Sequence, residues 1–97
     1  MKVYRTSLLK ATRKTHYLVE KIEFINIRLF TLGKKIQFTQ DRTITFTALQ
    51  TVKYLKGYLL RLKRMILNNI FLNVDKQILL DKINFGVELS NFILRGK

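Results

Sequence analysis

The chain has 97 residues, which is enough for one small domain and too few for two independent folding units. It carries 19 Lys and Arg against 6 Asp and Glu, a net charge of +13, while 47% of its residues are hydrophobic. The apolar content excludes a disordered basic tail, and the charge is unusual for a soluble enzyme. The composition therefore predicts a folded chain with a polyanionic partner, either nucleic acid or an anionic membrane surface.

Cysteine is absent, which removes disulfides, thiolate metal sites and cysteine nucleophiles. A membrane-spanning helix needs about 20 mostly apolar residues. The longest stretches without charge are only ten residues each, at 43–52 and 65–74. We therefore expect no transmembrane insertion. We also expect no secretory signal, because Lys10 follows the apolar pair Leu8-Leu9.

The first 19 residues contain five basic side chains and no acid. This pattern is typical of a mitochondrial transit peptide, and equally of a basic arm lying on RNA. A short helix capped by Ser7 would place the following residues roughly on one face: Leu8, Leu9, Thr12, His16 and Val19. Residues with A/T-rich codons are abundant, including ten Ile and twelve Lys against two Ala, which favours an organellar origin.

Residues 22–32 are densely apolar and predict a short strand feeding a short helix. Gly33 is the predicted end of that helix, because glycine accepts positive φ. From residue 35 to 46 apolar and polar residues alternate, which predicts an extended segment. The apolar members of that alternation are Ile36, Phe38, Ile44 and Phe46.

A long amphipathic helix is predicted over residues 47–69, with Thr45 or Thr47 as its N-cap. At about 100° per residue, one set of side chains forms a core face: Val52, Leu55, Leu59, Leu62 and Ile66. Tyr54, Tyr58 and Met65 follow one border of that face. We interpret the two tyrosines as the edge of the core, with stacking on bases as the alternative. A second set forms a positive stripe, with Arg61 nearer the tyrosine border: Lys53, Lys56, Lys63 and Arg64.

The C-terminal segment, residues 74–97, has two interpretations. Asp75 can cap a short helix to about Lys82, after which residues 83–89 alternate as in a strand. A continuous helix over 75–94 would instead be apolar nearly all round, which indicates burial against another chain.

Nothing in the sequence resembles a catalytic centre. His16 stands alone, the six acids are dispersed, and there is no phosphate-binding glycine loop or metal-ligand cluster. We therefore predict no enzymatic activity, catalytic residue, metal, cofactor or small-molecule substrate, and we place His16 on the surface.

Residues 42–74 contain six basic residues and no acidic one, so their electrostatic field attracts phosphates.

Several short motifs resemble the bacterial and organellar family of small-subunit ribosomal protein eighteen. They appear in the family's order over about half of the chain: Ile22-Glu23-Phe24, Leu29-Phe30, Gly33-Lys34-Lys35-Ile36, Arg42 with Thr45, Arg61-Leu62-Lys63-Arg64 and Ile70-Phe71-Leu72-Asn73. The resemblance implies a small helical core bound to small-subunit rRNA, beside small-subunit ribosomal protein six. It also implies RNA contacts at Arg42, Arg61, Lys63 and Arg64, and at Lys34 and Lys35 through the glycine-lysine motif.

The expected protein is thus mainly α-helical. It has a basic N-terminal arm (1–20), a helical rRNA-binding core (21–73) with an extended segment before its long basic helix, and a C-terminal extension (74–97). The helical periodicity of residues 47–69 adds Lys53 and Lys56 of the positive stripe to the predicted RNA-binding residues. The expected function is that of a structural constituent of an organellar, mitochondrial small ribosomal subunit. The alternative is a basic accessory subunit of a mitochondrial membrane complex, resting on anionic lipid.

Overall fold

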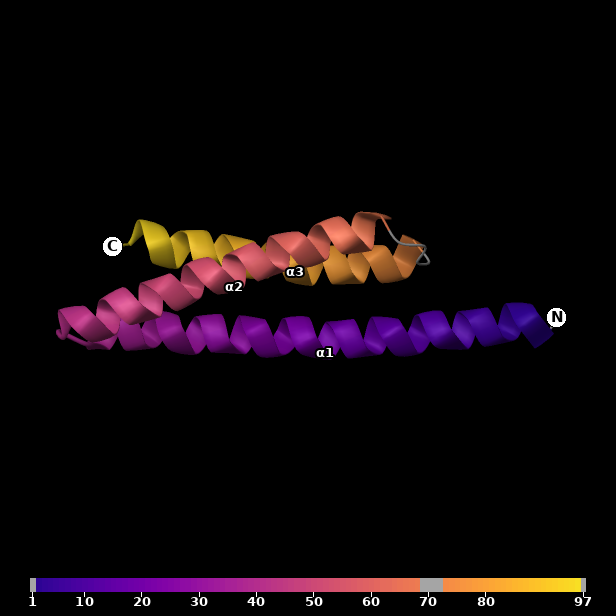
Figure 1. The fold of residues 1–97 in the computed structure, drawn as a ribbon, viewed down its shortest axis with the longest axis horizontal. Coiled ribbons are helices and arrows are strands. Elements are labelled where there is room, and N and C mark those ends of the chain that lie inside the picture. Colours follow the sequence, from indigo (N-terminus) through magenta and orange to yellow (C-terminus); the bar gives the residue numbers. More distant parts are fainter. Residues whose placement is uncertain (1, 69–72, 97) are drawn as a thin grey trace.

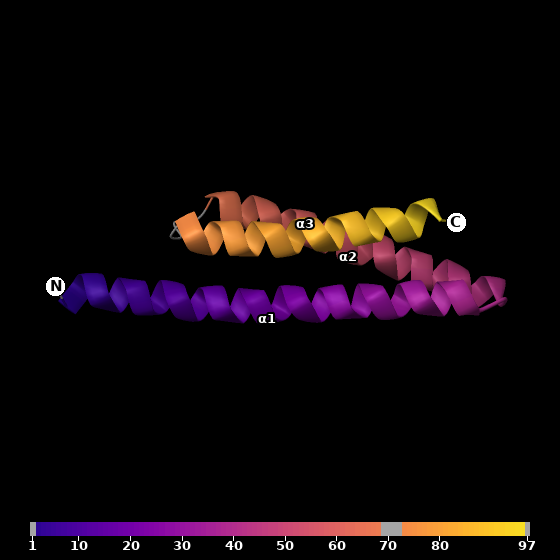
Figure 2. The same ribbon diagram turned by 180° about the vertical axis from the view of Figure 1, so that it is seen from behind.

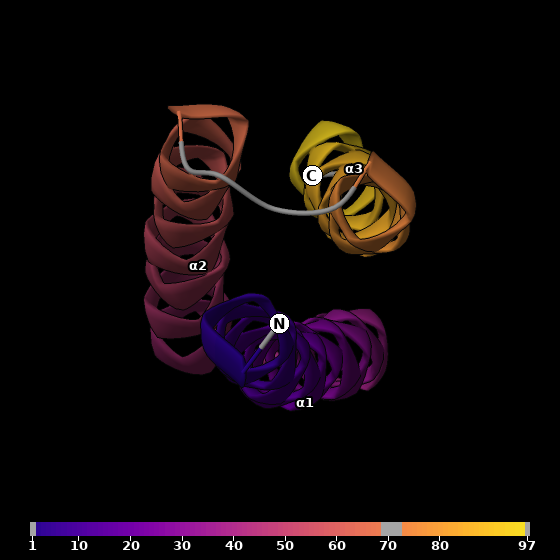
Figure 3. The same ribbon diagram turned by 90° about the vertical axis from the view of Figure 1, so that its right-hand side faces the viewer.

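The computed structural model describes residues 2–68 and 73–96, with side chains described for 13–68 and 75–96. Three helices form an elongated bundle of 60 × 17 × 16 Å: α1 (Lys2–Phe38), α2 (Arg42–Asn68) and α3 (Asn73–Arg95). The helices alternate in direction, so α2 runs antiparallel to α1 and α3 (Figures 1 and 2). Viewed end-on, they occupy the corners of a triangle (Figure 3). No strand occurs within the described residues, so the mainly α-helical prediction is confirmed.

Helix α1 is continuous where the sequence predicted an arm, a strand and a helix ending at Gly33. The break predicted at Gly33 is wrong, and no glycine among the described residues has positive φ. Gly33 has a packing role instead, since a Cβ there would lie 3.1 Å from Ile93 Cδ1 of α3. The missing side chain lets the two helices approach closely. Of the helix face predicted for residues 8–19, Val19 packs against the core but His16 is exposed, so the place of His16 on that face is wrong. The side chains of Leu8, Leu9 and Thr12 lie outside the described ones.

The extended segment predicted for residues 35–46 is replaced by the end of α1, a three-residue connection and the start of α2. Asp41 explains the early start of α2. Its Oδ1 accepts hydrogen bonds from the backbone N–H groups of Thr43, at 2.8 Å, and Ile44, at 3.4 Å. This is N-cap geometry, so the caps predicted at Thr45 or Thr47 are one turn or more too late. The apparent alternation arose because the ends of two different helices meet in this stretch.

The core face predicted for α2 is confirmed. All five predicted residues are buried, together with Ala48: Val52, Leu55, Leu59, Leu62 and Ile66. Residue 69, where the prediction ended this helix, lies outside the described residues.

Helix α3 is continuous to Arg95, so the strand interpretation of residues 83–89 is wrong. Its inward positions repeat at three and four residues and include two small ones: Leu79, Ile83, Gly86, Ser90 and Ile93. Gly86 and Ser90 lack the hydrophobicity that marks a core face, which conceals the helical period in the sequence. Ser90 is accommodated because its Oγ donates a hydrogen bond to the carbonyl of Gly86, at 2.8 Å.

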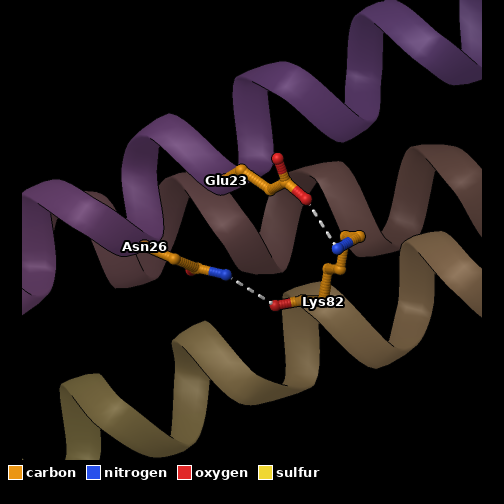
Figure 4. Close-up of polar contacts among 3 residues, drawn as sticks. All are labelled: Glu23, Asn26 and Lys82. Carbon is orange, nitrogen blue, oxygen red and sulfur yellow. Dashed lines mark hydrogen bonds and ion pairs between the residues drawn. The ribbon is translucent and has the colours of Figure 1, made fainter.

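A polar junction joins α1 to α3 near the middle of the bundle (Figure 4). Asn26 Nδ2 donates to the backbone carbonyl of Lys82, at 3.1 Å, and Lys82 Nζ pairs with Glu23 Oε1, at 2.7 Å. The hydrogen bond of the Asn26 side chain is more shielded from solvent than the ion pair, since the side chains of Glu23 and Lys82 are partly exposed. These contacts fix the position of α3 along α1.

Candidate nucleic-acid interface

The positive charge is concentrated on two of the three helices. Helix α1 contains nine basic and two acidic residues, and α2 contains six basic residues and no acidic one. Helix α3 contains three of each and is neutral overall. A polyanion that approaches the bundle is therefore attracted to the side formed by α1 and α2.

Helix α1 carries a row of bases at seven-residue spacing: Lys14, Lys21, Arg28 and Lys35. Seven residues are nearly two helical turns, so these side chains leave α1 on almost the same side. We call this set the α1 basic row. Lys35 lies 21 residues after Lys14, which is about 32 Å along the helix.

The contact of Lys21 with a tyrosine of α2 indicates that the α1 basic row lies on the side of α1 next to α2. Lys21 Nζ lies 5.1 Å from the ring centroid of Tyr58 and 5.9 Å from that of Tyr17. On the other helix, Arg61 Cζ lies 5.9 Å from the ring of Tyr58. These distances are in the cation–π range. We call Tyr17, Lys21, Tyr58 and Arg61 the tyrosine–cation cluster; it joins the two basic helices across their boundary.

The environment of Lys21 keeps its ammonium group charged. A side-chain hydrogen bond with Tyr58 raises the pKa of Lys21 above its usual value, as does the electrostatic effect of the same phenol. Partial burial acts in the opposite direction, and Tyr17 adds a smaller increase to the pKa. The shift leaves the charge of Lys21 at neutral pH unchanged, because an ordinary lysine is already protonated there.

The two tyrosines of α2 have different surroundings. Tyr58 is half-buried and packs against the core, as the sequence predicted. Tyr54 is 65% exposed, so its prediction as part of the core edge is wrong. Tyr54 lies one turn before Tyr58 on the same side of α2, and Tyr17 of α1 is 62% exposed. Two exposed phenol rings therefore lie on the helices that carry most of the basic side chains, α1 and α2.

The structure divides the predicted positive stripe of α2 among three directions. Lys53 and Arg64 are exposed on the side opposite the buried residues, while Arg61 turns toward α1. Lys56 and Lys63 are half-buried on the side next to α3, where Lys63 Nζ donates to Asn84 Oδ1, at 3.1 Å.

The remaining predicted residues lie near the connection between α1 and α2 or beside α3. Arg42 is exposed at the first position of α2, and Lys35 is the last member of the α1 basic row. Lys34 points to another side of α1, where its Nζ lies 4.8 Å from the Phe30 ring centroid. Lys34 and Lys35 are therefore neighbours in sequence but belong to different surfaces.

Lys14, Lys21 and Arg28 were not among the binding residues predicted from the sequence. Their seven-residue spacing with Lys35 was visible in the sequence, but the predicted strand and helix break prevented their placement on one helix. The contact between Lys21 and Tyr58 depends on how α1 packs against α2, which no local pattern indicates.

Most acidic side chains contact groups other than the bases of the α1 basic row. Asp41 caps α2, Glu23 pairs with Lys82, and Asp75 Oδ2 accepts a hydrogen bond from Thr15, at 3.1 Å. Glu20 pairs with His16 Nε2 at 3.0 Å, and both side chains are exposed, so the prediction of a surface His16 is confirmed.

A different, apolar surface lies around α3. Two adjoining hollows, of about 760 and 500 Å³, share Leu89 and Phe92 in their walls. Phe85 and Phe92 are largely exposed there, and Lys34 and Lys56 line the hollows from α1 and α2.

Within the described residues, no group of three or more potential metal ligands occurs, and no helix has both the length and the hydropathy needed to cross a membrane.

Comparison with protein-family models, with curated proteins and with solved structures found no match to this chain.

Proposed function

We propose that the chain binds RNA through the face formed by α1 and α2, and that it is a structural, non-catalytic constituent of the mitochondrial small ribosomal subunit. The RNA-binding part of the proposal depends on the α1 basic row, which faces a helix with six basic residues and no acidic one. Such an arrangement neutralises phosphates and releases counterions, which gives affinity without a specific base sequence.

The ribosomal part of the proposal depends on the resemblance to the family of small-subunit ribosomal protein eighteen. The proposed RNA contacts include three exposed basic residues that the resemblance implies: Lys35, Arg42 and Arg61. Small-subunit rRNA is the proposed partner, with neighbouring ribosomal proteins, among them small-subunit ribosomal protein six. The A/T-biased composition supports a mitochondrial location.

A second candidate function has one observation in its favour. Phe24, Ile27 and Phe38 are exposed on the outer side of α1, close to Arg28 and Lys35. Apolar side chains flanked by bases are typical of helices that lie on an anionic lipid surface. The second candidate is therefore a basic accessory subunit of a mitochondrial membrane complex.

Fractionation of mitochondria separates the two functions. With a tagged full-length chain, the proposal predicts co-sedimentation with small-subunit rRNA and release of the chain by ribonuclease. Retention in the membrane fraction after a high-salt wash and ribonuclease treatment would contradict the proposal and support the membrane alternative. Vesicles containing anionic lipid, with neutral vesicles as the control, test lipid binding directly.

A further inference from the structure

We infer that the α1–α2 face selects unpaired RNA over duplex RNA, because it combines a line of cations with exposed tyrosine rings. This inference rests on the proposed RNA-binding function and specifies the kind of RNA that the site prefers. The rings concerned are those of Tyr17 and Tyr54, which are 62% and 65% exposed.

Phosphate contacts alone do not favour a single strand, since a duplex carries the higher density of backbone charge. Aromatic rings make the distinction because they stack on bases whose faces are free. In an A-form duplex the bases are already stacked, and the side chains of a protein helix reach only backbone and groove edges. A face that carries both phenols and cations therefore binds an unpaired strand with contacts that a duplex cannot provide.

The tyrosine–cation cluster places the two kinds of contact beside each other. Lys21 Nζ lies 5.9 Å from the ring centroid of Tyr17 and 5.1 Å from that of Tyr58. A base that stacks on Tyr17 thus has a cation close by for its phosphate. Tyr58 has a different part, because it is half-buried and has Lys21 and Arg61 near its ring. Tyr58 is a positioning residue that holds these two cations.

The α1 basic row continues the contact surface beyond the tyrosines. Arg28 and Lys35 are exposed and lie one and two heptads after Lys21, in the direction of the connection to α2. Tyr54 precedes Tyr58 by one turn on α2, which runs antiparallel to α1, so Tyr54 is displaced from Tyr58 in the same direction as Arg28 from Lys21. A strand that leaves Tyr17 and follows the α1 basic row therefore passes the second exposed ring.

The experiment measures binding of the full-length chain to a fluorescein-labelled mixed-sequence RNA of about 16 nucleotides, the upper end of common single-strand site sizes. The same RNA annealed to its complement is the duplex probe. We expect at least about tenfold tighter binding to the single strand, since stacking on one ring alone contributes a factor of about five or more. The chain has no Trp, so its tyrosine emission can be followed directly and should fall when bases stack.

Two double variants test the role of the rings. Tyr17→Leu with Tyr54→Leu should weaken single-strand binding about tenfold or more and leave duplex binding unchanged. Tyr17→Phe with Tyr54→Phe should retain single-strand affinity, because Phe keeps the aromatic face and loses only the hydroxyl. Circular dichroism of each variant checks the helical fold, which should survive because both side chains are largely exposed.

The outcomes separate the two levels of the proposal. Equal binding of single strand and duplex, or no effect of the Leu variant, overturns the preference for unpaired RNA and leaves RNA binding in place. A wild-type chain that binds neither probe at low salt overturns RNA binding itself. Loss of affinity in the Phe variant to the level of the Leu variant also overturns the stacking role, since it assigns the effect to the hydroxyl groups.

Discussion

The side-chain amide of Asn26 on α1 packs directly against the backbone of Gly86 on α3. A Cβ on Gly86 would collide with Asn26 Oδ1 and would lie 2.6 Å from Leu59 Cδ1 of α2. Asn26 Oδ1 is buried, and no conventional hydrogen bond reaches it from the described residues. The residue at position 86 thus sets how closely all three helices converge.

Gly86→Ala should therefore destabilise the bundle, although alanine is the better helix former. We expect a loss of about 1–3 kcal/mol in the free energy of unfolding, the usual cost of overpacking a core. Urea denaturation followed by circular dichroism measures this change.

Gly57→Ala is the matched control, because Gly57 is also within a helix and a Cβ there meets no atom within 4 Å. It should increase the free energy of unfolding by about 0.5–1 kcal/mol. If Gly86→Ala also stabilised the protein, the close approach of the three helices would be wrong.

Leu59→Asp should prevent folding, because Leu59 is fully buried at this convergence and its replacement would place an unpaired charge in the core. Its sequence neighbour Leu60 is 38% exposed, so Leu60→Asp should keep the helical circular dichroism signal. If the effects of the two variants were exchanged, the assignment of the buried and exposed faces of α2 would be reversed.

Asp41→Ala should remove the cap of α2 and lower the free energy of unfolding by about 1 kcal/mol. The physical reason is that the backbone N–H groups of Thr43 and Ile44 would lose the acceptor that Asp41 Oδ1 provides. Asp41→Asn keeps an oxygen in place and should retain most of the stability. Thermal denaturation of the two variants compares them; equal loss in both would indicate a role for the charge rather than for the cap.

Removal of charge from the α1 basic row should reduce the salt dependence of RNA binding. Arg28→Gln with Lys35→Gln should lower the slope of log affinity against log salt by about 0.7 for each single-strand phosphate that the variant no longer neutralises. Fluorescence anisotropy between about 50 and 200 mM salt measures this slope.

The control for this experiment removes the same number of charges from the neutral helix α3, through Lys76→Gln with Arg95→Gln. Both double variants change the net charge equally, so a general field effect would alter them alike. Equal slopes in the two variants would argue against the α1 basic row as the contact surface.

The buried face of α2 could be predicted from the amino-acid sequence alone. The spacing of Val52, Leu55 and Leu59 identified the buried face of α2, because a long helix with one apolar side has a single way to exclude water from it. The sequence also identified the excess of positive charge and the place of Arg61 near the tyrosine border, since both follow from composition and helical period alone.

The ends of the helices and the contacts between side chains of different helices depend on how the helices pack together. Gly33 was predicted to end a helix and Gly86 to lie in a strand-like segment, yet both lie within helices, where their missing side chains allow α1 and α3 to approach. The contact of Lys21 with Tyr58 joins residues far apart in the chain, so no local period encodes it. Short-range propensities compete with packing between helices, and at these positions the packing energy outweighs the local preference.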